Sequence, residues 1–183
     1  KKRRNPELEA FYERDGMMRR YELESAILMN HNDPLQHMLE FVTKPRWFTP
    51  EEDQESRDVC PVLIPEKMAD DLGVTAAGVE RGDVFVSIGG IRFRVVGIFS
   101  SQSLRALRGL DGRDILPFDL ENMADFVVEE YTITAGDEDP RIEPERIVIT
   151  PVRTLFKNVS NCTERIVSVS VAGGREPKTS CAA

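Results

Sequence analysis

Apolar and polar residues alternate on both sides of a Gly-Gly pair near the middle of the chain, in VFVSIGGIRFRVVGIF at residues 84–99. A two-residue turn at Gly89-Gly90 fixes the pairing register, because the numbers of opposed residues in a hairpin have a constant sum. The expected pairs are Val84 with Val95, Val86 with Phe93, and Ile88 with Ile91. The pattern therefore predicts a β-hairpin with one wholly apolar face.

The alternate positions of this hairpin fall on the opposite, wetter face. Ser87 is expected to pair with Arg92 and Phe85 with Arg94, with the Arg94 guanidinium over the Phe85 ring. No helix start follows the glycines and no GK[ST] sequence is present, so neither the dinucleotide fingerprint nor the P-loop applies. We therefore favour a structural turn over a phosphate site.

The first 45 residues have a pattern that predicts helix. In NPELEAFYERDGMMRRYELESAILM, Asn5 is the expected N-cap, Pro6 takes the first helical position, and acidic residues occupy the first turn. Gly16 would divide this helix into two pieces. A turn at HNDP and a short helical stretch over 35–42 would complete an N-terminal helical segment, residues 1–45.

A strand, a proline and a helix follow one another in DVCPVLIPEKMADDLG, residues 58–73. The apolar run stops at Pro65, and Gly73 supplies a left-handed end to the helix that follows. Residues 74–83 are expected to be a connector to the hairpin. Earlier, Thr49 and Pro50 are expected to open one helical turn.

The same order of elements returns in RIVITPVRTLFKNVSNCTERIVSVSVAGG, residues 146–174. Here a strand over 146–149 leads to Thr150 as cap and Pro151 at the first helical position, and Ile166–Val171 alternates as a second strand. VLIP at 62–65 set beside VITP at 148–151 indicates a weak internal duplication.

Two βαβ units of this kind predict an α+β fold, in which a small mixed sheet carries helices on one side in the split βαβ arrangement. We expect the core halves at 46–100 and 146–174 and a C-terminal tail at 175–183. Residues 101–145 would form an irregular accessory insertion. In this insertion we expect a short helix in SSQSLRALRGL, a strand in FVVEEYTIT and an exposed loop in GDEDPRIEPE.

Composition fits a folded, soluble body, with 40% apolar and 31% charged residues. The formal net charge of -8 argues against nucleic acid as a partner. KKRR at the start is the only dense basic run, and a solvated tail, an artificial chain end and a membrane-proximal segment all remain open. Because the chain begins with lysine and has no apolar run of the roughly 20 residues that cross a bilayer, we expect a soluble piece of a longer protein.

No residue pattern assembles a catalytic, cofactor-binding or metal site, so we assign none and expect no enzyme activity and no cofactor. The only histidines, His31 and His37, are six residues apart and poorly spaced as a ligand pair. An acidic run at 137–139 could hold a cation weakly, but a solvated turn is the preferred interpretation. Cys60 is expected to pack as a small hydrophobe, and a Cys60–Cys162 bridge stays open for an oxidising compartment.

Three motifs occur in a distinctive order: RWFTPEED at 46–53, VLIPEKMADDLG at 62–73 and VSIGGIRFRVVGIF at 86–99. In this order the chain resembles the MacB-like periplasmic core domain of FtsX-type ABC transporter permeases. The resemblance is good over 46–101 and fair over 146–174, where VITPVRTLF and SVSVAG are similar to later family elements. The motifs are mainly structural.

The resemblance implies an extracytoplasmic, periplasmic domain inserted between the first two transmembrane helices of a cytoplasmic-membrane permease. Such a domain does no chemistry; a partner ATPase subunit hydrolyses ATP in the cytoplasm, and the domain changes its pose to act on a substrate, a lipoprotein or another partner protein. A permease dimer partner is also implied. The alternative hypothesis is a freestanding ferredoxin-like module that binds small molecules or proteins. A hydrolase using the acidic run is the weakest hypothesis.

Overall fold

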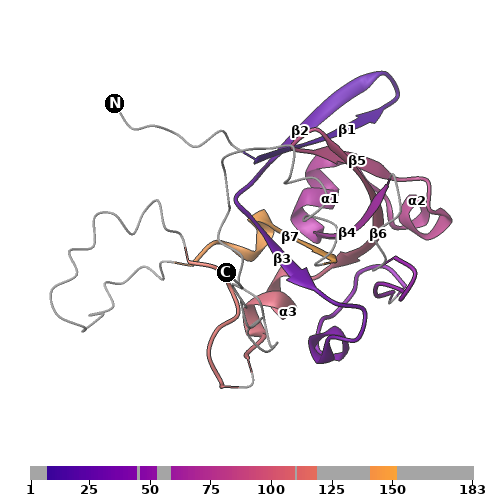
Figure 1. The fold of residues 1–183 in the computed structure, drawn as a ribbon. Coiled ribbons are helices and arrows are strands. Elements are labelled where there is room, and N and C mark those ends of the chain that lie inside the picture. The colour runs from indigo at the N-terminus through magenta and orange to yellow at the C-terminus, as the bar shows by residue number, and fades with distance from the viewer. Residues whose placement is uncertain (1–7, 45, 53–58, 110, 119–140, 152–183) are drawn as a thin grey trace, which may run out of the picture.

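A mixed seven-stranded sheet organises the chain, in a computed structural model that describes residues 8–44, 46–52, 59–109, 111–118 and 141–151 (Figure 1). The strands are β1 (Leu8–Arg14), β2 (Met17–Leu23), β3 (Ser25–Met29), β4 (Cys60–Pro65), β5 (Phe85–Ile88), β6 (Ile91–Phe99) and β7 (Ile147–Pro151). The α-helices are α1 (Glu66–Leu72), α2 (Ala76–Arg81) and α3 (Ser101–Ala106), and the 3-10 helices are η1 (Pro34–His37) and η3 (Pro144–Arg146). The strand order is β2-β1-β5-β6-β4-β7-β3, and the α+β class is as predicted.

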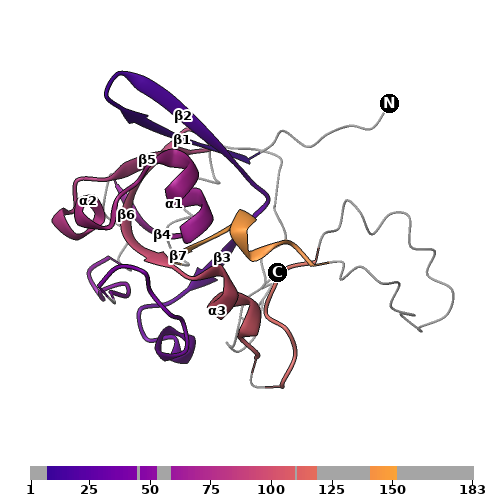
Figure 2. The same ribbon diagram turned by 180° about the vertical axis from the view of Figure 1, so that it is seen from behind.

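The sheet curls until its two edges approach each other. β2 and β3 are the two edge strands, yet only Glu24 separates them in the sequence. The Glu24 N–H donates a hydrogen bond to the carbonyl of Arg146, 2.9 Å away, beside the start of β7. Figures 1 and 2 show the resulting incomplete barrel, with α1 at its centre.

The hairpin at Gly89-Gly90 is confirmed. The pairs Phe85–Arg94, Val86–Phe93, Ser87–Arg92 and Ile88–Ile91 all occur, and Val95 donates its N–H to the Val84 carbonyl at 3.0 Å. The predicted apolar face is buried except at Ile91, which is half-buried. One detail was wrong: the guanidinium over the Phe85 ring belongs to Arg92, 4.3 Å from the ring centre, while Arg94 turns to another partner.

The prediction of an N-terminal helical segment is wrong, because β1, β2 and β3 occupy most of the stretch that was expected to be helical. Asp15 and Gly16 both have positive φ, at 54° and 74°, and join β1 to β2. An Asp-Gly pair suits such a turn, whose central residues must both be left-handed. Gly16 therefore reverses a strand and does not split a helix. Asn5 and Pro6 lie outside the described residues.

The helical stretch expected over 35–42 is also shorter than predicted. Only η1 forms there, and the Asp33 carboxylate caps it by accepting the Leu35 N–H at 3.0 Å. Beyond it, the chain lies beside the end of β6, where Phe41 makes an isolated antiparallel bridge to Phe99 and the Val42 N–H donates to the Ile98 carbonyl at 2.9 Å. The Asp33 carboxylate satisfies one backbone N–H of this turn, and the helix ends at His37.

The strand and helix around Pro65 are confirmed as β4 and α1, and Gly73 ends α1 with φ 74°. The prediction of an irregular connector at 74–83 was wrong, because these residues contain the helix α2. Thr75 caps α2 through its side chain, which accepts the Gly78 N–H at 3.3 Å, and Gly82 ends it in the left-handed region. A Thr cap followed by a Gly stop is a helix signal that a six-residue span makes easy to miss.

The strand expected over 146–149 is confirmed in β7, which extends to Pro151. Thr150 does not cap a helix. It lies within β7, and its hydroxyl donates to the Pro61 carbonyl of β4 at 2.9 Å. Pro151 is the last residue of β7, so its expected place at the first helical position is wrong. The rest of the second predicted βαβ unit, including Cys162 and Ile166–Val171, lies outside the described residues.

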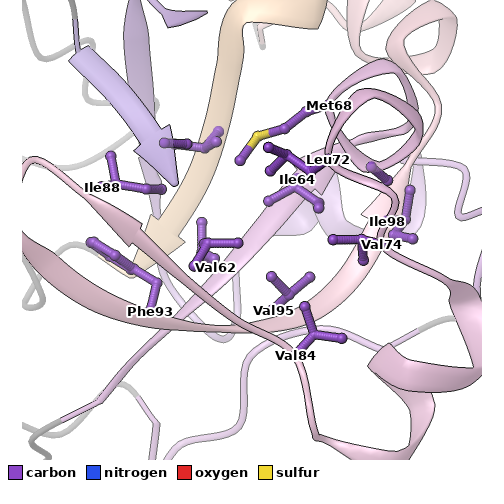
Figure 3. Packing of buried hydrophobic residues seen from close by; sticks show 14 of the residues in the cluster. Val62, Ile64, Met68, Leu72, Val74, Val84, Ile88, Phe93, Val95 and Ile98 are labelled. Atoms are coloured by element: carbon purple, nitrogen blue, oxygen red, sulfur yellow. The ribbon is translucent and has the colours of Figure 1, made fainter. Parts of the chain in front are cut away.

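Two apolar clusters pack on opposite faces of the sheet. On the inner face, α1 contributes Met68 and Leu72 to a cluster with β4, β5 and β6 residues (Figure 3). On the outer face, α3 contributes Leu104 to a cluster that includes Leu63 and Phe99. Helices therefore cover both faces, and the expectation of helices on one side was wrong.

The parallel pair β4–β6 is also not split by another strand. β4 pairs directly with β6, and β5 lies on the far side of β6 as its hairpin partner. The short turn at Gly89-Gly90 makes β5 and β6 neighbours, and β1 pairs with the other side of β5.

The predicted insertion is described only in part. Its short helix is confirmed as α3, and Phe118 bridges to Arg141. The strand expected in FVVEEYTIT and the acidic run at 137–139 lie outside the described residues. Cys60 is half-buried against the inner cluster, in agreement with a packing role.

Candidate functional site

Of the candidates that the sequence offered, those in the described part of the chain do not come together as a reactive site. His31 is half-buried before η1 and His37 is exposed at its end. Within the described residues no group of three or more His, Cys, Asp or Glu side chains could hold a metal ion. Gly89 and Gly90 are exposed turn residues, and the two arginines beyond them have separate partners.

A buried carboxylate, Glu52, is the centre of the most organised polar cluster. Its side chain is only 2% exposed. Its Oε1 accepts hydrogen bonds from Nη2 of Arg46, at 2.6 Å, and from Nη2 of Arg94. A buried charge is tolerated only when it is paired and hydrogen-bonded, and Glu52 meets both conditions.

The turn at 49–52 holds Glu52 in place by a reciprocal pair of hydrogen bonds. Glu52 Oε2 accepts the Thr49 N–H at 3.0 Å, and the Thr49 hydroxyl accepts the Glu52 N–H at 3.3 Å. This is the capping-box pattern, in which Thr and Glu three residues apart satisfy each other's backbone donors. Thr49 and Pro50 therefore open a single hydrogen-bonded turn and not the predicted turn of helix, and this turn orients the carboxylate toward β6.

A cleft of about 420 Å³ lies beside this cluster. The loop before Trp47, the end of α2 and the middle of β6 form its walls. Its lining residues are Thr43, Lys44, Arg46, Val79, Glu80, Arg81, Gly82, Arg94, Val95 and Val96. We call this space the Arg94 cleft. Its size is in the range of small-molecule pockets.

The walls of the Arg94 cleft carry more positive than negative charge. Among the residues that the structure describes, Lys44, Arg46, Arg81 and Arg94 line it together with one carboxylate, Glu80. Glu80 accepts the backbone N–H of Lys44 at 3.2 Å and so ties α2 to the loop. The cleft is thus a local cationic region on a chain of net charge -8.

A second hollow lies at the seam of the curled sheet, between β2, α1 and η3. Arg20, Tyr21, Lys67 and Arg146 line it together with Glu22, Asp71, Glu143 and Glu145. The Tyr21 hydroxyl donates to the Glu145 carbonyl at 3.0 Å. Burial, assisted by the charges of Asp71 and Glu145, raises the pKa of Tyr21 to about 12. Both acidic and basic side chains line this hollow, which gives it no clear preference for a ligand charge.

Nearby, Arg146 forms an ion pair with Glu24, and this hydrogen bond raises the pKa of the guanidinium. The pair links the β2–β3 junction to η3 and closes the seam from outside. Its role is structural, because the charge of each group is already paired with that of the other.

Sequence reasoning missed the Glu52 cluster, although two signals for it were present. TPEE at 49–52 contains the Thr-x-x-Glu spacing of a capping box. The hairpin register also placed Arg94 on the face opposite the apolar core. What the sequence does not show is that residues 46–52 cross this face, because that contact joins positions 42 residues apart.

Comparison with known proteins returned no matching family model, no similar curated protein and no similar solved structure. Of the helices in the described ranges, none has both the length and the apolar character required to cross a membrane. The fold and the Arg94 cleft are therefore the basis for a functional proposal.

Proposed function

We propose that this chain is the extracytoplasmic domain of an FtsX-type ABC transporter permease, and that it transmits conformational work without catalysing a reaction. The supporting observation is the arrangement of the three family-like motifs. They form the turn at 49–52, the β4–α1 unit and the β5–β6 hairpin, and these pack together at the centre of the fold. The motifs thus belong to one structural unit.

The contacts within this unit suit a domain that moves as one body. β4 pairs with β6 along its length, and Glu52 joins the first motif to the third through Arg94. A rigid element is what a partner ATPase subunit would need in order to move the domain through the rest of the permease. A periplasmic location, a permease dimer and action on a lipoprotein or substrate belong to the same proposal.

The proposal also includes the finer fold. β4, α1 and β6 form one βαβ unit, and β7 is the strand with which the proposed second unit at 146–174 would begin; the rest of that stretch lies outside the described residues. The direct β4–β6 pairing means that the first unit is not split, so the proposed likeness to a porter-like fold rests on the pairing of two units and not on a split βαβ unit.

The complete gene product tests the transporter proposal. Long apolar segments are expected on both sides of the chain in the gene. An alkaline phosphatase reporter inserted at the exposed Gly112 of the full-length protein should be active, because this reporter requires an extracytoplasmic location. A fluorescent protein that matures only in the cytoplasm, inserted at the same residue, should stay dark. A fluorescent fusion with an inactive phosphatase fusion contradicts the proposal.

The alternative, a freestanding ligand-binding module, is favoured by one observation, the cationic Arg94 cleft. It predicts a gene without flanking apolar segments and a chain that is complete in function without a membrane. A thermal-shift screen with a panel of anionic metabolites would support it through a ligand-dependent rise in the unfolding temperature.

A further inference from the structure

The outer half of the β1–β2 hairpin leaves the main sheet. β1 pairs with β5 only at Ala10 and Phe11, although it continues to pair with β2 as far as Arg14. Every residue from 13 to 20 is exposed, and Figures 1 and 2 show the turn end of the hairpin at the rim of the molecule. We call residues 13–20 the arm. The arm is thus a two-stranded extension that β5 does not support.

The base of the same hairpin belongs to the core. Ala10 and Leu23 are buried in the inner-face cluster, and Tyr12 and Tyr21 pack against that cluster. Displacing the base would expose these apolar groups to water, which is costly, whereas displacing the arm would not. The base can therefore act as a fixed pivot for the arm.

Two arginines attach the arm to the C-terminal end of α1. Arg14 Nη1 donates a hydrogen bond to the Gly73 carbonyl at 2.7 Å. Arg19 Nη1 lies so close to Gly73 that a Cβ on this glycine would be 2.5 Å from it. A cation is favoured at the C-terminal end of a helix, so both contacts have the right sign. The Arg14 side chain is 46% exposed, and a contact in water adds little net stability, so the attachment is specific but weak.

The attached arm forms part of the wall of the hollow between β2, α1 and η3. Arg20 of the arm lines this hollow together with Lys67 and Asp71 of α1. Because the arm is attached to α1 at Gly73, release of the two arginines would let the arm move away from α1 and widen the hollow on that side. We propose that the arm is a hinged lid, which docks on the end of α1 through Arg14 and Arg19 and swings about its packed base to open the hollow. This inference goes beyond the transporter proposal, since it holds for the chain with or without a membrane.

Residual dipolar couplings of the backbone amides in the isotope-labelled chain test the swing, because they report the orientation of the arm averaged over fast and slow motions. The couplings of β4, β6 and β7 define the orientation of the body. In the double variant Arg14→Gln, Arg19→Gln, the arm couplings should fall by about a third or more relative to those of the parent chain, as expected for a segment that becomes mobile. They should still fit one common alignment, because the arm moves as a unit.

A matched variant and a second measurement separate the lid from a general loss of charge. Arg20 also lies in the arm, but it pairs with Glu9 of the same hairpin at 3.2 Å, so Arg20→Gln should leave the arm couplings at the parent value. A neutral gadolinium chelate in solution enhances the relaxation of accessible amides. In the double variant this enhancement should rise about twofold or more at Lys67 and Asp71, as the open state becomes populated, and should not change at the fully buried Val62.

The possible results divide clearly. Smaller arm couplings that share one alignment, together with greater enhancement at the hollow, support the lid. Equal couplings in the parent chain and the double variant overturn it, and so does an equal effect of Arg20→Gln. Arm couplings that collapse without a common alignment also overturn the swing, because the hairpin has then unfolded. A moving arm with unchanged enhancement at Lys67 and Asp71 overturns the lid, since the hollow would not open.

Discussion

The hydroxyl of Thr150 donates a hydrogen bond to the main-chain carbonyl of Pro61, 2.9 Å away, and joins the two segments that carry the repeated apolar-Pro phrase. VLIP lies in β4 and VITP in β7, and the strands are antiparallel neighbours, with Leu63 opposite Ile149. The Pro61 carbonyl lies next to an irregularity in the β4–β6 pairing between Val62 and Leu63. A side-chain donor is therefore supplied where the regular ladder is disturbed.

Replacement of Thr150 by Val should destabilise the chain by about 1–3 kcal/mol, because it leaves the buried Pro61 carbonyl without this donor while it preserves the side-chain shape. Thr150→Ser keeps the hydroxyl and should cost less. Urea unfolding monitored by the single tryptophan, Trp47, measures both. If Val and Ser variants unfold at the same urea concentration, the hydrogen bond carries no stability.

Glu52→Gln should lower the free energy of unfolding by about 1–3 kcal/mol. The amide cannot balance the two guanidiniums that meet at Oε1, and these arginines are partly exposed, at 41% and 35%, which limits the loss. Glu80→Gln is the control, since Glu80 is exposed and its Oε1–backbone hydrogen bond survives the change. Equal stability of Glu52→Gln and the parent chain would show that the cluster is not a structural anchor.

At the β1–β2 turn, Gly16→Ala should destabilise the chain by about 1–2 kcal/mol, the cost of placing an ordinary residue in the left-handed region. No atom lies within 4 Å of the position that a Cβ would occupy, so the cost is in the backbone alone. Gly16→Asn should recover part of it, because asparagine tolerates positive φ. Chemical denaturation of the three proteins gives the comparison, and an alanine variant as stable as the parent would contradict the turn.

Local sequence patterns predicted those elements whose cause is local. The Gly-Gly hairpin, α1 with its Gly73 stop, and α3 each depend on turn and cap residues within a few positions. The N-terminal strands were mispredicted because Pro6 and the acidic residues near it resemble a helix start. Asp15 and Gly16 form a β-turn in the structure, but in the sequence Gly16 was interpreted as a break between two helical pieces.

Long-range pairing explains the remaining errors. The position of Arg94 was predicted to the correct face, but its partner was not, because Glu52 reaches it from a separate segment. The same limit applies to the Arg94 cleft, whose walls come from the 43–46 loop, α2 and β6. The net charge of the whole chain, -8, gives no indication of this local cationic region.

Gly97→Ala should destabilise the chain by about 1–3 kcal/mol through overpacking. A Cβ at Gly97 would lie 2.9 Å from Leu63 Cδ2 and 3.2 Å from Phe41 Cε1. Leu63 is fully buried, so its side chain has little room to withdraw. Adding Leu63→Val to Gly97→Ala should then cost less than the sum of the two single changes, as a double-mutant cycle would measure. Strict additivity would show that the new methyl is accommodated elsewhere.

Because the pKa of Tyr21 is raised in the folded chain, part of the folding stability is lost as the pH rises into the alkaline range. Burial favours the neutral phenol in the folded chain, where its pKa is about 12 against an ordinary value of 10.0. The unfolded chain therefore loses this proton first, so the stabilisation is complete below the ordinary pKa and is lost as the pH rises toward the folded value. The expected result is a urea midpoint that falls across this window more steeply in the parent chain than in Tyr21→Phe.

Absorbance of the tyrosinate band identifies the group responsible for this slope. The difference between titrations of the parent chain and Tyr21→Phe isolates one phenol, which should ionise near pH 12 while the chain is folded. Tyr12→Phe is the matched control and should keep the late-ionising component, because Tyr21 is still present. A difference curve centred at the ordinary value of 10.0 would mean that the hydrogen bond to the Glu145 carbonyl and the seam around it do not shield Tyr21 in solution.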